Sequence, residues 1–220
     1  MKIKQGLKEE VAAATRRFWE KGLTPGRDAG DISVRDVETG LIYICPRPKP
    51  KVLRIPNWGM IKAEHMVVIT LDGTVVDDNG LLPTVEAPMH LAIYRARPDV
   101  NAIVHSHAIC SSAFAVTGKN IPLILAEQSL RLGGEVVCAA YGRVGSQELA
   151  DNIVAALGKH KMAALIQNHG AVTLGVTLEE AFIASDFLEK GAQVAILGTT
   201  LGPLIVRTPD EILDDSLKKQ

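Results

Sequence analysis

The chain has 220 residues, of which 47% are hydrophobic and only 4% aromatic, and its formal net charge is -1. This composition excludes a disordered chain and predicts a core of Ala, Val, Ile and Leu side chains. The near-zero charge, with no basic block longer than the interrupted run RPKPK at 47–51, excludes a nucleic acid as partner. No apolar run approaches the roughly 18 residues that span a bilayer, so we expect no membrane partner.

The cysteines and the N-terminal segment indicate a compartment. Cys45, Cys110 and Cys138 are odd in number and widely spaced, which argues against a disulfide framework and for a reducing environment. Residues 1–19 carry charges throughout and lack the apolar core of a signal peptide. We therefore expect a soluble, cytoplasmic protein, and we find no internal repeat that would divide residues 1–220 into more than one domain.

The first third of the chain predicts one helix followed by short strands. Residues 5–22 have apolar side chains at helical spacing. After a glycine-containing loop, residues 32–36 and 40–46 are short and rich in β-branched side chains, which indicates strands. Residues 65–76 predict a β-hairpin that turns at an Asp-Gly pair.

The rest of the chain predicts alternating strands and helices. Ser146 and Thr177 stand where N-cap residues are expected, directly before helical patterns. The predicted helices cover 86–99, 108–118, 146–160 and 177–198, and the predicted strands cover 101–107 and 163–170. The alternation predicts a single α/β domain in which helices cover a sheet.

Two histidines lie one residue apart where an apolar strand ends. Side chains alternate along a strand, so His105 and His107 should project from one face while Ser106 points away. Two imidazoles so placed form half of a site for a metal such as zinc. His169 ends another apolar strand and is a third candidate ligand, with Gly170 allowing the chain to turn tightly behind it.

The histidine pattern alone leaves a second interpretation open, because many histidines are polar residues satisfied by protein partners. We assign His65, His90 and His160 to that class. Glu86 begins a predicted helix, where the helix dipole stabilises a carboxylate. It is either an ordinary first-turn glutamate or a carboxylate that ligates a metal or acts as a general base.

Three stretches together resemble the class II aldolase/adducin family: PTVEAPMHLAIYRARPDVNAIVHSHAICSSAF, IPLILAE and ALIQNHGAVTLGVTLEEAF. The resemblance covers nearly the whole chain. It implies that His105, His107 and His169 bind a divalent metal, usually Zn²⁺, with Mn²⁺ or Co²⁺ as alternatives. It implies that Glu86 is a movable ligand and the acid/base residue. It also implies a three-layer α/β/α sandwich with a central, mostly antiparallel sheet, assembled as a homotetramer with active sites at subunit interfaces.

The implied function is carbon–carbon bond cleavage on a small molecule. A metal chelated by a hydroxy-ketone or keto acid polarises the carbonyl and stabilises an enediolate or enolate. The leading expectation is aldol cleavage of a sugar phosphate like L-fuculose 1-phosphate. A decarboxylase or aldolase acting on an unphosphorylated acid is the first alternative. A sugar-phosphate 4-epimerase is third, since epimerases of the family typically carry Asp at the position of Glu86. A non-catalytic adducin-like module is the alternative outside enzymes, and adducin-type members lack the metal residues that this chain retains.

The segments expected around the substrate depart from the family's phosphate-binding pattern. The loop RDAGDIS carries carboxylates where phosphate-binding members have a hydroxyl and an amide, and a carboxylate repels a phosphate dianion. In the segment ICPRPKP, Arg47 and Lys49 either offer cations to a substrate carboxylate or form a solvated loop. The candidate substrate-binding residues are Asp28, Gly30, Asp31, Arg47 and Thr84.

A proton-donating tyrosine of the aldolases is missing at its usual place. The segment IPLILAE has Ala126 where that tyrosine is expected. Tyr141 is the nearest remaining phenol, and we interpret it as a packing residue.

Overall fold

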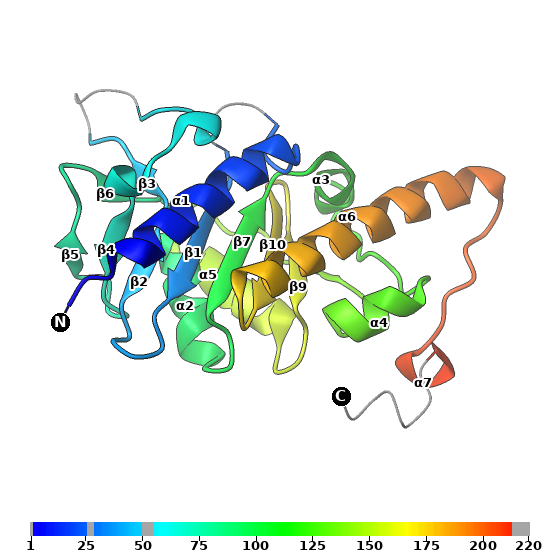
Figure 1. The fold of residues 1–220 in the computed structure, drawn as a ribbon. Helices are drawn as coiled ribbons and strands as arrows, with labels where there is room; N and C mark the ends of the chain where they lie inside the picture. Colours follow the sequence, from blue (N-terminus) through cyan, green and yellow to red (C-terminus); the bar gives the residue numbers. More distant parts are fainter. Residues whose placement is uncertain (1, 26–28, 50–54, 213–220) are drawn as a thin grey trace.

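The computed structural model describes residues 2–25, 29–49 and 55–212, and it centres on an eight-stranded sheet with helices on both faces (Figure 1). The strand order is β5-β4-β2-β1-β7-β10-β9-β8. All neighbouring strands pair antiparallel except β8 and β9, which pair parallel. The expected α/β fold with a central, mostly antiparallel sheet is confirmed.

The strands of the main sheet are β1 (Asp31–Arg35), β2 (Ile42–Ile44), β4 (Val67–Ile69), β5 (Val75–Asp77), β7 (Ala102–Ser106), β8 (Val137–Ala139), β9 (Ala163–Ile166) and β10 (Gly170–Gly175). A separate pair joins β3 (Pro46–Arg47) to β6 (Leu82–Pro83). The α-helices are α1 (Gln5–Glu20), α2 (Ala87–Ala96), α3 (Ile109–Ala115), α4 (Ala126–Leu132), α5 (Gln147–Leu157), α6 (Leu178–Leu201) and α7 (Pro209–Ile212). Two 3₁₀ turns, Trp58–Met60 and Ala63–His65, precede β4.

Strand alternation divides the buried side chains of β1 and β7 between the two faces of the sheet. Ile32 and Val34 of β1 pack with side chains of α1 and α6, whereas Ser33 between them hydrogen-bonds to His90 of α2. On β7, Ile103 belongs to the core under α2 and α5. The α2 face of the sheet is therefore apolar along most of its length and becomes polar where β1 begins and β7 ends.

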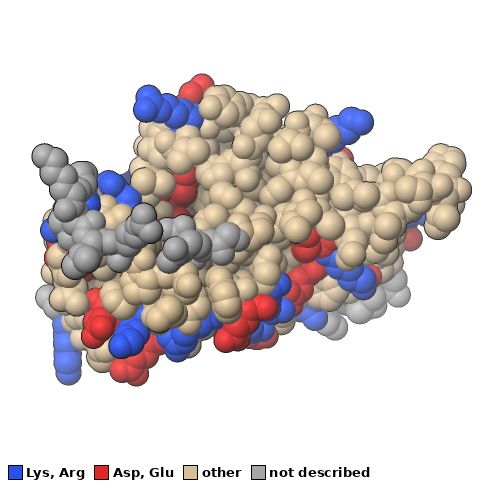
Figure 2. Space-filling view, turned by 90° about the horizontal axis from the view of Figure 1, so that it is seen from above, with Lys and Arg blue, Asp and Glu red and all other residues tan. Residues whose placement is uncertain are grey.

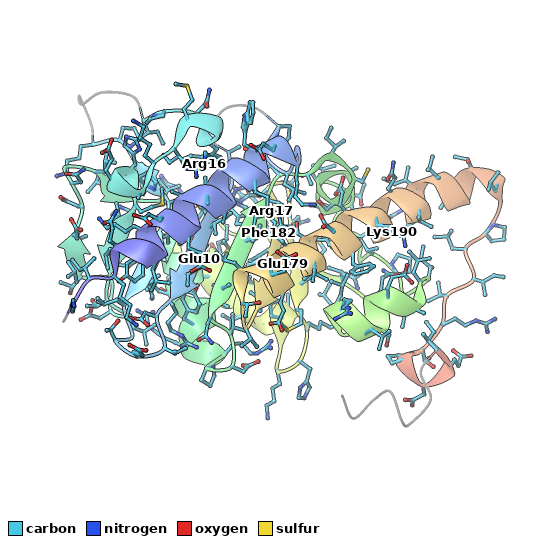
Figure 3. All side chains as sticks on the ribbon, in the orientation of Figure 1. Glu10, Arg16, Arg17, Glu179, Phe182 and Lys190 are labelled. Carbon is cyan, nitrogen blue, oxygen red and sulfur yellow. The ribbon has the colours of Figure 1, made fainter. Side chains whose placement is uncertain are left out.

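Helices α1 and α6 lie side by side over the other face (Figures 1 and 3). Arg17 of α1 forms an ion pair with Glu179, and its guanidinium lies 4.5 Å from the ring centre of Phe182. Lys21 pairs with Asp186 at 2.8 Å. These ion pairs are partly exposed and contribute little each. The buried apolar side chains beneath them hold the two helices on the sheet.

The structure confirms the predicted helices and the hairpin formed by β4 and β5. The two N-caps are present, since Ser146 Oγ accepts from the Leu149 amide and Thr177 Oγ1 from the Glu180 amide. The predicted alternation of strands and helices fails at two places: helix α3 is followed directly by helix α4, and β9 is followed by β10 in an antiparallel hairpin. Among the described residues, no helix is long and apolar enough to cross a membrane.

Candidate metal centre and active site

The three candidate histidines meet at one end of the sheet. His105 lies near the end of β7, His107 directly follows that strand, and His169 directly precedes β10, which pairs with β7. Their ring centroids are 4.8 to 4.9 Å apart, and one nitrogen from each lies within 4.8 Å of the others. The sheet thus brings together side chains from distant parts of the sequence.

Hydrogen bonding orients the imidazoles toward one another. His105 Nδ1 lies 3.0 Å from the Ala171 carbonyl, to which it donates, and this turns Nε2 toward the cluster. His105 Nε2 lies 3.2 Å from His107 Nε2. Among the described residues, the buried Nδ1 of His169 has no hydrogen-bond partner. A buried nitrogen without a partner is unusual, and a divalent cation would satisfy it. The residues present therefore fit such an ion.

Burial lowers the pKa of all three histidines to about 4. A neighbouring imidazole lowers the pKa of each one further, because two positive rings at this distance repel each other. The cluster is consequently neutral at pH 7. Neutral imidazole is the form that ligates a metal.

Two glycines allow the close backbone approach that this end of the sheet requires. A Cβ on Gly30, whose φ is +73°, would lie 2.4 Å from the His105 carbonyl oxygen. A Cβ on Gly170 would lie 2.3 Å from the Ser106 carbonyl oxygen. The turn before β10 places its positive φ, 58°, at Asn168. The expectation that Gly170 makes the turn is therefore wrong, and its role is to let β10 approach β7.

Glu86 is the N-cap residue of α2 and is only 3% exposed. Within the described chain, neither of its carboxylate oxygens has a hydrogen-bond partner. Burial raises the pKa of Glu86 to about 7, and the nearby charge of Asp31 adds to the increase. A carboxyl group with a pKa near neutrality can both accept and return a proton at physiological pH.

A cavity of about 220 Å³ joins these groups. The described residues that line it include the three histidines, Glu86 and four of the five candidate substrate-binding residues, namely Gly30, Asp31, Arg47 and Thr84. Val85 and Trp58 line it as well. Asp28 lies outside the described residues. Lys49 pairs with Asp78 at 3.3 Å and is not among the described lining residues. Sequence reasoning missed Trp58, whose indole Nε1 donates to the Gly30 carbonyl at 3.2 Å.

Asp31 is buried and fully engaged on both oxygens. Its Oδ1 lies 2.7 Å from His90 Nε2, and its Oδ2 accepts from Thr84 Oγ1. Burial alone would raise the pKa of Asp31, but the charge and hydrogen bond of His90, together with His105 and the Thr84 hydrogen bond, outweigh burial and lower it to about 2. His90 is thus a buried histidine satisfied by protein partners, with Ser33 Oγ 2.7 Å from its Nδ1.

Arg47 and Tyr141 differ in their relation to the cavity. Arg47 Nε donates to the Pro83 carbonyl at 3.0 Å, and Arg47 lines the cavity. Tyr141 is 60% exposed and is not among the described residues that line the cavity. The interpretation of Tyr141 as a packing residue is wrong.

Comparisons with known proteins show to which family the chain is related. A model of the class II aldolase and adducin N-terminal domain matches residues 9–196. The chain is 34% identical over 194 residues to L-fuculose phosphate aldolase of Escherichia coli K12, covering 87% of this chain and 83% of that protein. It is 30% identical over 216 residues to 5-deoxy-D-ribulose 1-phosphate aldolase of Bacillus thuringiensis, covering 98% and 95%.

Solved structures give the same result for the fold. A structure of L-fuculose 1-phosphate aldolase superposes with a TM-score of 0.88 at 28% identity, covering 99% of this chain and 96% of that one. The Escherichia coli protein YgbL, for which aldolase, epimerase and decarboxylase activities are all considered, superposes with a TM-score of 0.78 at 26% identity, covering 96% and 98%. Members of this family that are class II aldolases depend on a metal, and this chain carries the histidine triad. The chain belongs to the class II aldolase and adducin family.

Proposed function

We propose that this chain is a divalent-metal-dependent carbon–carbon lyase that performs aldol cleavage of a hydroxy-ketone sugar phosphate such as L-fuculose 1-phosphate. The observation that carries the proposal is the shared cavity of three neutral histidines and a buried, unpartnered glutamate with a raised pKa. The two relatives, L-fuculose phosphate aldolase and 5-deoxy-D-ribulose 1-phosphate aldolase, support the same reaction class. Zn²⁺ is the proposed ion because imidazole nitrogens and a carboxylate suit it.

The proposed roles divide the work between the histidines and the glutamate. His105, His107 and His169 would hold the ion, and Glu86 would be the fourth protein ligand before substrate arrives. The ion, when bound, supplies polarisation of the substrate carbonyl. Glu86 then accepts a proton from the substrate hydroxyl or carbon and returns it after the bond breaks. Its burial keeps water from competing for that proton.

A second candidate is decarboxylation or aldol cleavage of an unphosphorylated acid. The observation that favours it is the ionised Asp31 in the cavity wall, because its fixed charge disfavours a phosphate dianion beside it. Arg47 at the same cavity could pair with a single carboxylate. Both candidates use the same ligands and the same acid/base residue. They differ in the substrate and, for decarboxylation, also in the bond that breaks.

The experiment that tests the function is metal analysis joined to a turnover screen. Purified protein reconstituted with Zn²⁺, Mn²⁺ or Co²⁺ is assayed with L-fuculose 1-phosphate, 5-deoxy-D-ribulose 1-phosphate and unphosphorylated hydroxy and keto acids. Release of an aldehyde from a sugar phosphate supports the first candidate, and release of carbon dioxide from an acid supports the second. Epimerised sugar phosphate would identify an epimerase. Bound metal without any turnover would favour the adducin-like binding module.

We also propose a homotetramer with active sites at subunit interfaces. The support is an apolar surface formed by α3, the end of α6 and the segment after it, where a further cavity of about 510 Å³ lies. Figure 2 shows that the end of α6, which extends away from the body, carries few charged groups. The exposed apolar residues of this surface include Ile109, Val116, Leu197, Leu201, Ile205 and Val206. A second copy of the chain is the proposed occupant, because the family resemblance implies such an assembly.

We propose a cytoplasmic location. Within the described chain the three cysteines are unpaired, which suits a reducing compartment. Localisation of a tagged chain by cell fractionation tests this proposal.

A further inference from the structure

Two hydrogen bonds tie the segment that carries Glu86 to a single carboxylate on β1. Thr84 lies two residues before Glu86, and its Oγ1 donates a hydrogen bond to Asp31 Oδ2 at a distance of 2.5 Å. His90 lies four residues after Glu86, and its Nε2 is 2.7 Å from Asp31 Oδ1. Asp31 therefore holds both ends of the short segment that contains the proposed acid/base residue.

The same two residues also bind the backbone of Glu86. The Glu86 amide donates to Thr84 Oγ1 at 3.2 Å, and the His90 amide donates to the Glu86 carbonyl at 3.2 Å. A closed ring of interactions thus runs from Asp31 through Thr84, the Glu86 backbone and His90 back to Asp31. The Glu86 side chain takes no part in it, since within the described residues both of its oxygens lack partners.

The position of Asp31 on the sheet gives this ring its significance. Asp31 and His105 are direct Cα partners in the antiparallel pairing of β1 with β7. A ring closed on Asp31 therefore fixes Glu86 relative to a proposed metal ligand. A further pair of bonds supports the arrangement from behind, because Ser33 Oγ lies 2.7 Å from His90 Nδ1 and 2.8 Å from Tyr94 Oη.

We propose that Asp31 is a positioning residue. Together with Thr84 and His90, it holds the Glu86 segment at the strand position opposite His105. The Glu86 carboxyl group then remains free to act at the histidine cluster. We call this arrangement the clamp. This inference rests on the proposed function for the role of Glu86. It differs from the sequence expectation, in which Asp31 and Thr84 bind substrate. Their polar atoms are already engaged within the protein, and Asp31 is 2% and Thr84 8% exposed.

The clamp predicts that Asp31 acts only through Glu86. Removing a group that orients a metal ligand typically lowers metal affinity or activity 10- to 100-fold. We expect Asp31→Asn to weaken Zn²⁺ binding about tenfold, measured by chelator competition, and to lower kcat similarly with little change in KM. In a Glu86→Gln background, the same Asp31→Asn change should alter Zn²⁺ affinity less than about twofold, because the residue through which it acts is gone.

Matched variants separate positioning from loss of structure. Asp36→Asn is the control, since Asp36 is a buried carboxylate just beyond the other end of β1. It accepts hydrogen bonds from Lys4 and Thr39, and it is not one of the described residues that line the cavity. It should leave Zn²⁺ affinity unchanged. Should Asp31→Asn fail to fold, Thr84→Val tests the same ring, and Thr84→Ser should restore the loss because it retains the hydroxyl.

Two results would overturn the clamp. One is an equal loss of Zn²⁺ affinity from Asp31→Asn with and without Glu86, which would mean that Asp31 acts independently of it. The other is an Asp31→Asn enzyme with raised KM, unchanged kcat and unchanged Zn²⁺ affinity, which would make Asp31 a substrate-binding residue. If no compound is turned over, the proposed function fails, but the affinity cycle still decides whether the clamp exists.

Discussion

Among the three histidines, His107 gives the clearest test of metal binding, because it lies beyond the end of β7 and its side chain makes few contacts that stabilise the fold. Its backbone amide donates to the Leu23 carbonyl, and among the described residues the hydrogen-bond partner of its imidazole is another member of the triad, His105. His107→Ala should therefore fold normally yet bind well below one Zn²⁺ per chain, by elemental analysis after dialysis. His160→Ala is the control, since His160 is exposed and is not one of the described residues that line the cavity. Full occupancy in His107→Ala would contradict the ligand assignment.

Glu86 and the histidines respond to pH in opposite ways in the metal-free protein. The folded-state pKa of Glu86, about 7, lies above its ordinary value, so ionising this residue opposes folding, and stability is lost as pH rises through 7. The folded-state pKa of each histidine, about 4, lies below its ordinary value. The unfolded chain then binds more protons, and stability is lost as pH falls from about 6.5 toward 4.

This opposition gives a pH-dependent prediction for Glu86→Gln. The substitution removes the buried charge, so at pH 8 the metal-free variant should be more stable to urea than the wild type, by about 3 kcal/mol. At pH 5, where Glu86 is protonated in the folded protein, the two should differ little. If the free energies of unfolding of wild type and Glu86→Gln differed by the same amount at pH 5 and pH 8, burial would not raise the pKa of the Glu86 carboxyl group.

At the scale of elements, the pairing of β7 with β10 depends on Gly170. An added Cβ would lie 2.3 Å from the Ser106 oxygen, and the two strands must separate to accommodate it. We expect Gly170→Ala to lower the free energy of unfolding by about 1–3 kcal/mol in urea denaturation. Zn²⁺ affinity should fall as well, because His169 moves away from His105.

Gly6→Ala provides the opposite comparison. Gly6 lies in the first turn of α1, and no described heavy atom beyond its chain neighbours and helix backbone comes within 4 Å of an added Cβ. Alanine there should stabilise the protein by up to about 1 kcal/mol, because it restricts the unfolded chain. Equal effects of the two substitutions would show that backbone proximity at Gly170 is not the cause.

The spacing of apolar residues predicted the elements that have one buried and one exposed face. It missed the short elements that are held in place by tertiary contacts. Helices α1, α2, α5 and α6 carry apolar residues at helical spacing, α5 and α6 also begin at N-cap residues whose side chains accept a backbone hydrogen bond, and β7 is a buried apolar run. Helix α4 has seven residues, and its start is fixed by the Gln128 carboxamide, which accepts from the Ile124 and Leu125 amides. No local pattern reports that arrangement.

The candidate site shows the same division. Alternation on one strand was enough to pair His105 with His107, and the ends of predicted elements offered His169 and Glu86 as further candidates. The family resemblance then implied that the four residues form one site. The contact of Asp31 with His90 could not be predicted in this way, because it joins β1 to α2 across a distance that only the folded sheet closes. A helical spacing of four between Glu86 and His90 was the one available signal that they share a helix face.

At the scale of the whole molecule, the end of α6 should be an interface between subunits. Leu201 is 92% exposed in the isolated chain, beside further exposed apolar side chains. An aspartate there would place a charge in a desolvated contact. We expect wild-type protein to be tetrameric by light scattering and Leu201→Asp to dissociate into smaller species without loss of helical circular dichroism. A monomeric wild type would contradict the assembly.

The ligands of the proposed ion come from three separated parts of the chain: the start of α2, the end of β7 and the turn before β10. An ion held by all three would act as a cross-link that exists only in the folded state. At a free concentration one hundred times its dissociation constant it would add about 2.7 kcal/mol to stability. Metal scarcity would then reduce the amount of folded protein in the cell as well as its turnover, since the metal-free chain would unfold and be degraded more readily.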